Sequence, residues 1–195
     1  AAEQDRLNKL KKDLEASSVR LAELEKMMAD KDAAMKKLKE TLSKSLKAFE
    51  GKGLTVTERD GKVYVSMENK LLFESGSWTV GSEGKKAVDL VGKVLGDNPD
   101  ISVLIEGHTD NDKITGTIGG GVENNWDLST KRATAIVNIL SANAKVKKEN
   151  LTAAGRGEFA PLMSNDTAEG KAKNRRIEII LTPKLDEISK MLNEL

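Results

Sequence analysis

The sequence contains no cysteine and few proline or aromatic residues. Of its 195 residues, three are Pro, six are Phe, Trp or Tyr, and one is His. Without cysteine the chain forms neither disulfides nor thiolate sites, and its redox compartment cannot be inferred. No run of eighteen apolar residues is present, so the sequence predicts no membrane-spanning helix. An excess of one charge is also lacking, since 32 basic and 31 acidic residues nearly cancel. This balance gives no general attraction to nucleic acid or an anionic membrane.

The composition changes near residue 51. The first 50 residues contain 12 basic and 10 acidic side chains but neither glycine nor proline, and all 16 Gly lie from Gly51 onward. This break predicts a helical segment over residues 1–50 and a separate domain over residues 51–183. An amphipathic helical tail is predicted over residues 184–195, with four apolar residues at Leu185, Ile188, Leu192 and Leu195.

Apolar residues recur every seven positions in the first segment. The series is Leu7, Leu14, Leu21, Met28, Met35, Leu42 and Phe49. A period of 3.5 residues is typical of a left-handed coiled coil. A single helix of this length has little contact with itself, so it needs a partner. We therefore predict a dimerising coiled-coil stalk, with parallel and antiparallel pairing both open. Polar residues in the second seam (Ser17, Lys31, Ser45) weaken such a dimer, and the alternative is a helix folded back on the domain.

The second segment alternates predicted strands and helices. Alternating apolar residues flank Asp60-Gly61, a strong hairpin pattern. Strands are predicted over 54–57, 62–67, 101–105, 151–154 and 176–181, and helices over 82–95 and 127–142. This order predicts an α+β fold: a two-layer sandwich of one mixed sheet with two helices on one face.

Three polar motifs follow the predicted strands or begin a predicted helix. Glu106-Gly107-His108-Thr109-Asp110 stands at the end of strand 101–105, Asn125-Trp126-Asp127-Leu128-Ser129 begins the second helix, and Asn174-Arg175-Arg176 enters the last strand. Loops at strand ends are common places for binding sites. The sequence therefore predicts a polar site between these segments.

These motifs, in this order, resemble the OmpA-like C-terminal domain, the peptidoglycan-binding module of outer-membrane proteins, lipoproteins and flagellar stator proteins. Gly155-Arg156-Gly157 and the segment Leu72-Phe73-Glu74-Ser75-Gly76-Ser77 also resemble that family. The resemblance covers roughly Val63 to Leu181. The Asn-Trp-Asp-Leu-Ser form, with a long loop before it, is similar to the MotB-type stator branch. The coiled coil predicted ahead of the domain fits that branch or a lipoprotein equally.

The resemblance also implies roles for individual residues. Asp110 and Arg132 would hold the ammonium and the carboxylate at the free end of diaminopimelate in the wall stem peptide, as charge-assisted bonds. Further residues are implied to line the ligand: Thr109, Asn125, Leu128, Ser75, Gly76, and Arg175 or Arg176. No cofactor and no metal is expected. The expected partners are peptidoglycan and a second copy bound through residues 1–50.

The implied function is noncovalent peptidoglycan binding in the periplasm. The resemblance implies that the protein is attached to a membrane through an anchor outside this chain. One histidine and no cysteine leave neither a Cys–His pair nor a zinc triad, so no enzyme is predicted. Asp112 to Glu123 forms a glycine-rich insertion beside the expected pocket, interpreted as a lid, a partner surface or a disordered loop. Because of this insertion, the alternative function is also considered: a scaffold protein whose domain no longer binds the cell wall. His108 is interpreted as structural, and Trp126 as a core or staple residue.

Overall fold

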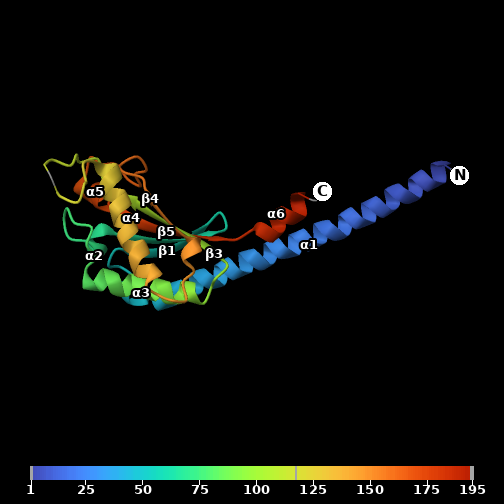
Figure 1. Ribbon diagram of the computed structural model, residues 1–195, viewed down its shortest axis with the longest axis horizontal. Helices are drawn as coiled ribbons and strands as arrows, with labels where there is room; N and C mark the ends of the chain where they lie inside the picture. The colour runs from blue at the N-terminus through green and yellow to red at the C-terminus, as the bar shows by residue number, and fades with distance from the viewer. Residues whose placement is uncertain (1, 117, 194–195) are drawn as a thin grey trace. The chain divides into compact units, whose positions relative to one another are not determined.

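The computed structural model describes residues 2–116 and 118–193 of the chain (Figure 1). It contains two units, one made of Ala1–Met35 and Leu185–Leu195 and the other of Lys36–Lys184. Leu195, which the sequence assigned to the amphipathic tail, lies outside the described residues. Among those residues, no helix combines the length and the apolar character that a bilayer crossing requires.

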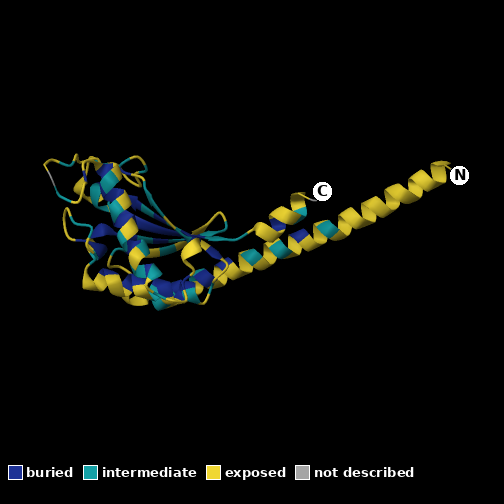
Figure 2. Ribbon diagram, in the orientation of Figure 1, coloured by how far each residue is buried: buried dark blue, intermediate teal, exposed yellow. Residues whose placement is uncertain are grey.

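Helix α1 (Ala2–Ser45) confirms the long helix predicted at the N-terminus. Its apolar seam divides into two parts (Figure 2). Leu7, Leu14, Leu21 and Met28 are all more than half exposed, and Leu14 is 71% exposed. Further along, three seam residues are buried within the chain itself, namely Met35, Leu42 and Phe49. These three side chains are not free for a partner, so the prediction of one continuous dimer seam is wrong for that part.

A short C-terminal helix, α6 (Asp186–Asn193), lies in the same unit as the first part of α1. Ile188 is buried, whereas Leu192 on the same helix is exposed. The Arg20 guanidinium of α1 donates a hydrogen bond to the Met191 carbonyl. Of the apolar residues predicted for the tail, Ile188 is therefore the one that is buried in this unit, and Leu185 is exposed like Leu192.

The second unit is built on a five-stranded mixed sheet in the order β1-β2-β5-β3-β4. Strand β3 pairs parallel with β4, and the other neighbours pair antiparallel. Asp60 and Gly61 both have positive φ and join β1 to β2, which confirms the predicted hairpin.

The helices and strands of this unit have the following bounds: β1 (Leu54–Arg59), β2 (Lys62–Glu68), α2 (Asn69–Leu72), α3 (Ser82–Gly96), β3 (Ile101–His108), α4 (Asn125–Ser141), β4 (Leu151–Gly155), α5 (Ala168–Asn174) and β5 (Arg176–Pro183). Short 3-10 turns lie at Lys47–Phe49 and Lys148–Asn150.

One face of the sheet is apolar and carries the two long helices. Helix α4 packs on β3 and β4, and α3 packs against α4. Alternation along the strands sends every second residue to this face. The residues are Val63, Val65, Met67, Val103, Ile105, Ile177, Ile179 and Leu181, and all are buried. This apolar layer confirms the predicted α+β arrangement of a mixed sheet with helices.

Two glycines allow α4 to approach the strand ends closely. A Cβ placed on Gly107 of β3 would lie 2.0 Å from the carbonyl oxygen of Ser129, and one on Gly155 of β4 would lie 2.1 Å from the Thr130 hydroxyl. Side chains at these positions would push α4 away from the sheet. Glycine here therefore sets the distance between the first turns of α4 and the loop that follows β3.

Candidate ligand-binding site

Strand β3 continues further than the sequence analysis predicted. It ends at His108 rather than Ile105, because Gly107 and His108 still pair with Ile177 and Arg176 of β5. Thr109 and Asp110 are therefore the first residues beyond the strand. The Thr109 backbone N–H donates to the Gly157 carbonyl at 2.9 Å, and its hydroxyl donates to the Asp110 carbonyl at 2.8 Å. These bonds fix the backbone from which the Asp110 side chain projects.

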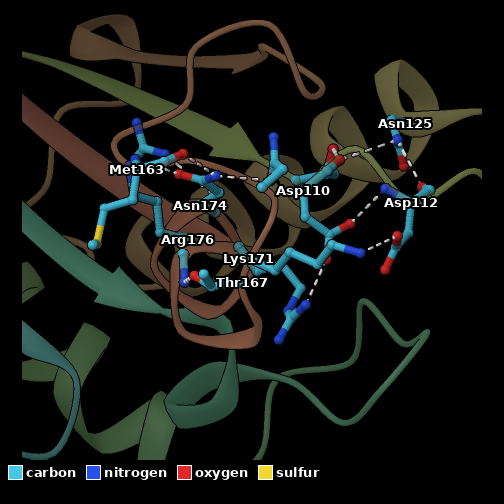
Figure 3. A network of polar contacts seen from close by, with 12 residues as sticks. Asp110, Asp112, Asn125, Met163, Thr167, Lys171, Asn174 and Arg176 are labelled. Carbon is cyan, nitrogen blue, oxygen red and sulfur yellow. Dashed lines mark hydrogen bonds and ion pairs between the residues drawn. The ribbon is translucent and has the colours of Figure 1, made fainter.

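The Asp110 carboxylate is buried and bonded at both oxygens (Figure 3). Oδ1 accepts a hydrogen bond from the Asp112 backbone N–H at 3.0 Å. Oδ2 accepts one from the Arg175 guanidinium at 2.5 Å. Because Arg175 is 42% exposed at its side chain, it contacts Asp110 from the solvent side. Asp110 is thus a buried carboxylate whose guanidinium partner is partly exposed to solvent.

Asn125 joins the three segments around this carboxylate. As the first residue of α4, it places its side-chain amide within hydrogen-bond distance of the carbonyl oxygens of Asp110 (3.3 Å) and Asp112 (3.0 Å) and of Glu158 Oε2 (2.7 Å). The preceding residue, Asn124, caps α4 by accepting from the Asp127 backbone N–H. The first turn of α4 is therefore held against the loop that carries Asp110.

Arg132 lies two helical turns further along α4 and is 5% exposed. Its Nε donates to the Ser77 carbonyl at 2.9 Å, and its guanidinium carbon lies 5.2 Å from the centre of the Phe73 ring. Burial, together with repulsion from Arg175, lowers the pKa of Arg132 to about 10, and Asp110 partly offsets this. Within residues 2–116 and 118–193, the Nε bond is the only hydrogen bond of this guanidinium. Its terminal nitrogens are left for another acceptor.

The bond to Ser77 connects α4 to the turn at Ser75-Gly76. Gly76 has a φ of +68°, a conformation that side chains rarely adopt, so glycine suits this turn. The two predicted residues, Ser75 and Gly76, are exposed and line a pocket of about 240 Å³ together with Trp78 and Ile118. Leu128, also predicted for the site, is buried on α4 between Asn125 and Arg132. The structure thus brings the predicted residues from four segments together.

Arg176 is placed differently from the other predicted site residues. It is 3% exposed, and its guanidinium donates to Glu178 Oε1, to the Asn174 carbonyl and to the Ala160 carbonyl. Three of its five N–H donors are bonded to protein acceptors, and so little of the residue is exposed that a ligand in solvent does not reach it. The alternation of β5 explains this, because Arg176 lies within the strand whereas Arg175 precedes it. Of the two candidates, the geometry supports Arg175.

Asn174 organises the neighbouring loop. Its side-chain oxygen accepts from the backbone N–H groups of Leu162 and Met163, and its amide donates to the Met163 carbonyl and to Asn165 Oδ1 (Figure 3). All of these bonds are between 2.7 and 3.0 Å, and Asn174 is fully buried. The residue therefore stabilises the segment that covers Arg176.

Glu106, His108 and Glu178 lie close enough together, within 4.8 Å, to hold a metal ion. His108 is buried, its Nε2 lies 3.4 Å from Glu106 Oε2, and neither ring nitrogen has a hydrogen bond. Burial first, and then the charge of Arg176, lowers the pKa of His108 to about 4. Arg176 already donates to Glu178, so a cation occupies the place where a metal would be needed. The cluster is better described as the buried polar base of the site.

The glycine-rich insertion from Asp112 to Glu123 is attached to the domain at several points. The Lys171 ammonium contacts Asp112 at 2.6 Å, and Lys131 donates to the Gly120 carbonyl while lying 5.1 Å from the Trp78 ring centre. Val122 is buried. Thr117, inside this insertion, lies outside the described residues. The three interpretations of the insertion stay open, but its two ends are fixed beside Asp110 and α4.

Sequence reasoning missed four residues that shape the site: Asp112, Ser129, Glu158 and Lys171. The Ser129 hydroxyl accepts from the Gly157 backbone N–H at 3.0 Å and so ties α4 to the loop after β4. Each is an ordinary polar residue in the sequence, and only the fold brings Ser129 to Gly157, Glu158 to Asn125, and Lys171 to Asp112. Of the two interpretations of Trp126, the core residue is wrong, since Trp126 is 50% exposed, and the staple residue stays a prediction.

The two-layer fold of this domain is shared with solved structures. A MotB-like protein of Desulfovibrio vulgaris superposes with a TM-score of 0.72 at 19% identity, over 81% of this chain and 96% of that one. The cell wall anchor of the T6SS from Pseudomonas aeruginosa has a TM-score of 0.65 at 28% identity, over 73% of this chain and 97% of that one.

The chain belongs to the OmpA family, whose model matches residues 72–175. Motility protein B of Bacillus subtilis (strain 168) is 34% identical over 120 residues, which are 62% of this chain and 45% of that protein. The peptidoglycan-binding protein ArfA of Mycobacterium tuberculosis is 41% identical over 83 residues, which are 43% of this chain and 23% of that protein. The chain thus spans less than half the length of each of these relatives. The predicted resemblance to the family and to its MotB-type branch is confirmed.

Proposed function

We propose that this protein binds peptidoglycan noncovalently and anchors a membrane-attached protein or complex to the cell wall. The names of the relatives support the class of ligand, since ArfA is a peptidoglycan-binding protein and the Pseudomonas protein a cell wall anchor. The proposed grip is on the diaminopimelate of the stem peptide. Its ammonium binds Asp110, and the carboxylate on the same carbon binds Arg132.

One observation carries this proposal: among residues 2–116 and 118–193, the terminal nitrogens of the buried Arg132 guanidinium have no protein acceptor, and the guanidinium interacts electrostatically with the buried Asp110 carboxylate. Burying an unpaired charge is costly, and the depressed pKa of Arg132 reflects that cost. A ligand that brings a carboxylate and an ammonium on one carbon satisfies both groups at once. Arg175 then exchanges its bond with Asp110 for a ligand carboxylate, and Ser75 and Gly76 line the peptide.

Calorimetric titration with a stem tripeptide that ends in diaminopimelate tests the grip. We expect Asp110→Asn and Arg132→Met each to weaken binding by roughly 30-fold, because each removes one charge-assisted bond. Arg59→Ala is the matched control, since this exposed arginine lies on β1 over Tyr64. Thermal melting of each variant separates loss of binding from loss of folding.

A second peptide tests the role of Arg132. Replacing diaminopimelate by lysine keeps the ammonium and removes the carboxylate. The wild-type protein is expected to prefer the diaminopimelate peptide, and Arg132→Met to lose that preference while it stays folded. Equal affinity of the wild-type protein for both peptides, or unchanged binding in both variants, would contradict the proposed grip.

We also propose that α1 pairs with a second copy of the chain through its exposed seam. Leu7, Leu14, Leu21 and Met28 leave an apolar stripe at seven-residue spacing, which a coiled-coil partner would cover. Sedimentation of the wild-type chain against Leu14→Asp/Leu21→Asp measures this. A dimer that becomes a monomer supports the proposal, and a wild-type monomer at all concentrations contradicts it.

This exposed seam is also what favours the alternative function, a coiled-coil scaffold of the envelope. Co-sedimentation with purified sacculi decides between them, because a scaffold dimerises but does not sediment with the wall. Fractionation of cells that express the full-length protein tests the proposed location in the periplasm.

A further inference from the structure

Two exposed aromatic side chains stack beside the proposed stem-peptide site. Trp126, on the first turn of α4, and Phe159, in the loop after β4, have ring centres 5.1 Å apart and planes 24° apart. Trp126 is 50% exposed and Phe159 is 63% exposed. Large apolar side chains gathered on a surface are costly in water and commonly mark a binding site. The pair has no role in the grip proposed for Asp110 and Arg132.

The backbone on both sides of the pair is held rigidly. Gly157 has a φ of +56°, and a Cβ there would lie 3.5 Å from the Phe159 ring and 3.6 Å from the Trp126 ring. The Gly157 N–H donates to Ser129 of α4, and its carbonyl accepts from Thr109. The Trp126 carbonyl in turn accepts from the Ser129 and Thr130 hydroxyls. A ligand therefore meets rings whose positions are set before it binds.

Polar side chains surround the rings. Trp126 and Phe159 line a pocket of about 290 Å³ together with Lys113, Glu123, Asn124 and Glu158. The set offers both hydrogen-bond donors and acceptors around an apolar floor. A flat aromatic surface with a ring of mixed polar groups suits a sugar, whose C–H face carries partial positive charge and whose hydroxyl and acetamido groups lie at the edge.

We propose that the pocket at Trp126 and Phe159 binds the amino-sugar glycan to which the stem peptide is attached. This inference rests on the proposed function and extends it from the peptide to the glycan. The two sites share Asn125, whose amide contacts both the Asp110 carbonyl and Glu158. A peptide held at Asp110 thus brings its sugar end towards this pocket, since two residues span about 7 Å.

Calorimetry with two ligands tests the inference. The first is the stem tripeptide alone, and the second is the same tripeptide on its disaccharide of N-acetylglucosamine and N-acetylmuramic acid. The wild-type protein is expected to bind the second ligand roughly tenfold more tightly. Phe159→Ala and Trp126→Ala are each expected to reduce this gain to less than about twofold, while the affinity for the bare tripeptide is kept.

Leu162→Ala is the matched control, because Leu162 lies in the same loop, is 54% exposed and is not part of the pocket. It is expected to keep the full gain. If Trp126→Ala fails to fold in a thermal melt, Phe159→Ala alone decides, since its side chain is the more exposed of the pair. Equal affinity of the wild-type protein for the two ligands, or a gain that survives in Phe159→Ala, would overturn the inference.

A sugar probe without peptide separates this inference from the proposed function. Chemical-shift changes of the Trp126 indole N–H on addition of a trimer of N-acetylglucosamine report the glycan pocket directly. If the tripeptide does not bind at all, the proposed function fails, whereas a shift with the trimer that is absent in Phe159→Ala still supports the pocket. No shift and no gain from the disaccharide would show that the rings serve another partner.

Discussion

The two faces of the sheet are buried by different means, although they alternate along the same strands. On the helix face, Val103, Ile105, Ile177 and Ile179 pack under α3 and α4. On the opposite face, near the strand ends, charged and polar side chains are equally buried, namely Glu68, His108, Arg176 and Glu178. The segment after β4 covers part of them, since its Ala160 carbonyl accepts from Arg176. Apolar side chains need only to be covered from water, whereas buried polar side chains also need hydrogen-bond or ion-pair partners.

This difference explains where the site lies. The apolar face gives the domain most of its stability, because burial of aliphatic side chains is the main favourable contribution to folding. The polar face holds the segment after β4 instead, because Arg176 donates to the Ala160 and Asn174 carbonyls and Asn174 accepts from the Leu162 backbone N–H.

Arg176→Met should lower the free energy of unfolding by about 3–5 kcal/mol, since it leaves the buried Glu178 carboxylate without its partner. Chemical denaturation measures the change. In the double variant Arg176→Met/Glu178→Leu, much of the stability should return because no buried charge is left unpaired. A single variant within about 1 kcal/mol of the wild type would contradict this account of the polar face.

Ile179→Ala, on the helix face, should lower the free energy of unfolding by about 2–5 kcal/mol, because it opens a cavity in the apolar layer of the sheet. The control is Ile179→Val, which removes one methyl group and should cost only about 0.5–1.5 kcal/mol. Unlike the loss of stability in Arg176→Met, this loss leaves no unpaired charge that a second substitution could remove. Equal costs for the two substitutions would mean that the face is not closely packed.

His108 should make stability depend on pH. Its pKa is about 4 in the folded protein and near 6.5 when unfolded, so the unfolded chain binds the proton more readily between these values. The contribution is therefore fully present above pH 6.5 and is lost as the pH falls towards 4. Between pH 7.5 and pH 5 the wild type should lose about 2 kcal/mol more than His108→Gln. Parallel pH profiles of the two proteins would refute this expectation.

The smallest effect is expected at Glu68, on the edge of the polar face. Burial raises the pKa of Glu68, but hydrogen bonds from Lys173 and Lys70 outweigh it and lower the pKa overall. Because Lys173 is 49% exposed, Lys173→Ala should cost less than about 1 kcal/mol. An NMR titration should show the pKa of Glu68 rising in this variant, whereas Lys145→Ala, which removes an exposed pair with Asp97, should leave it unchanged.

Several features of the fold were predictable because they depend on neighbours in the sequence. Asp60-Gly61 predicted a tight turn since few other residues adopt two successive positive φ values, and the hairpin is present. The length of β3 was not predictable in the same way. Gly107 and His108 look like loop residues, and they extend the strand only because β5 pairs with them. The exposure of Trp126 was not predictable either, because its ring stacks on Phe159, which lies in a distant loop.

By itself, the sequence determined the long glycine-free helix, the alternation of strands and helices, and the family to which the motifs belong. These follow from local periodicity and from residue types that act over a few positions. Only the tertiary structure decided that Arg175 rather than Arg176 faces Asp110, and that the last seam residues of α1 are covered within the chain. The reason is physical: neighbouring residues in a strand point to opposite faces, and which face is filled is settled by segments far away in the sequence.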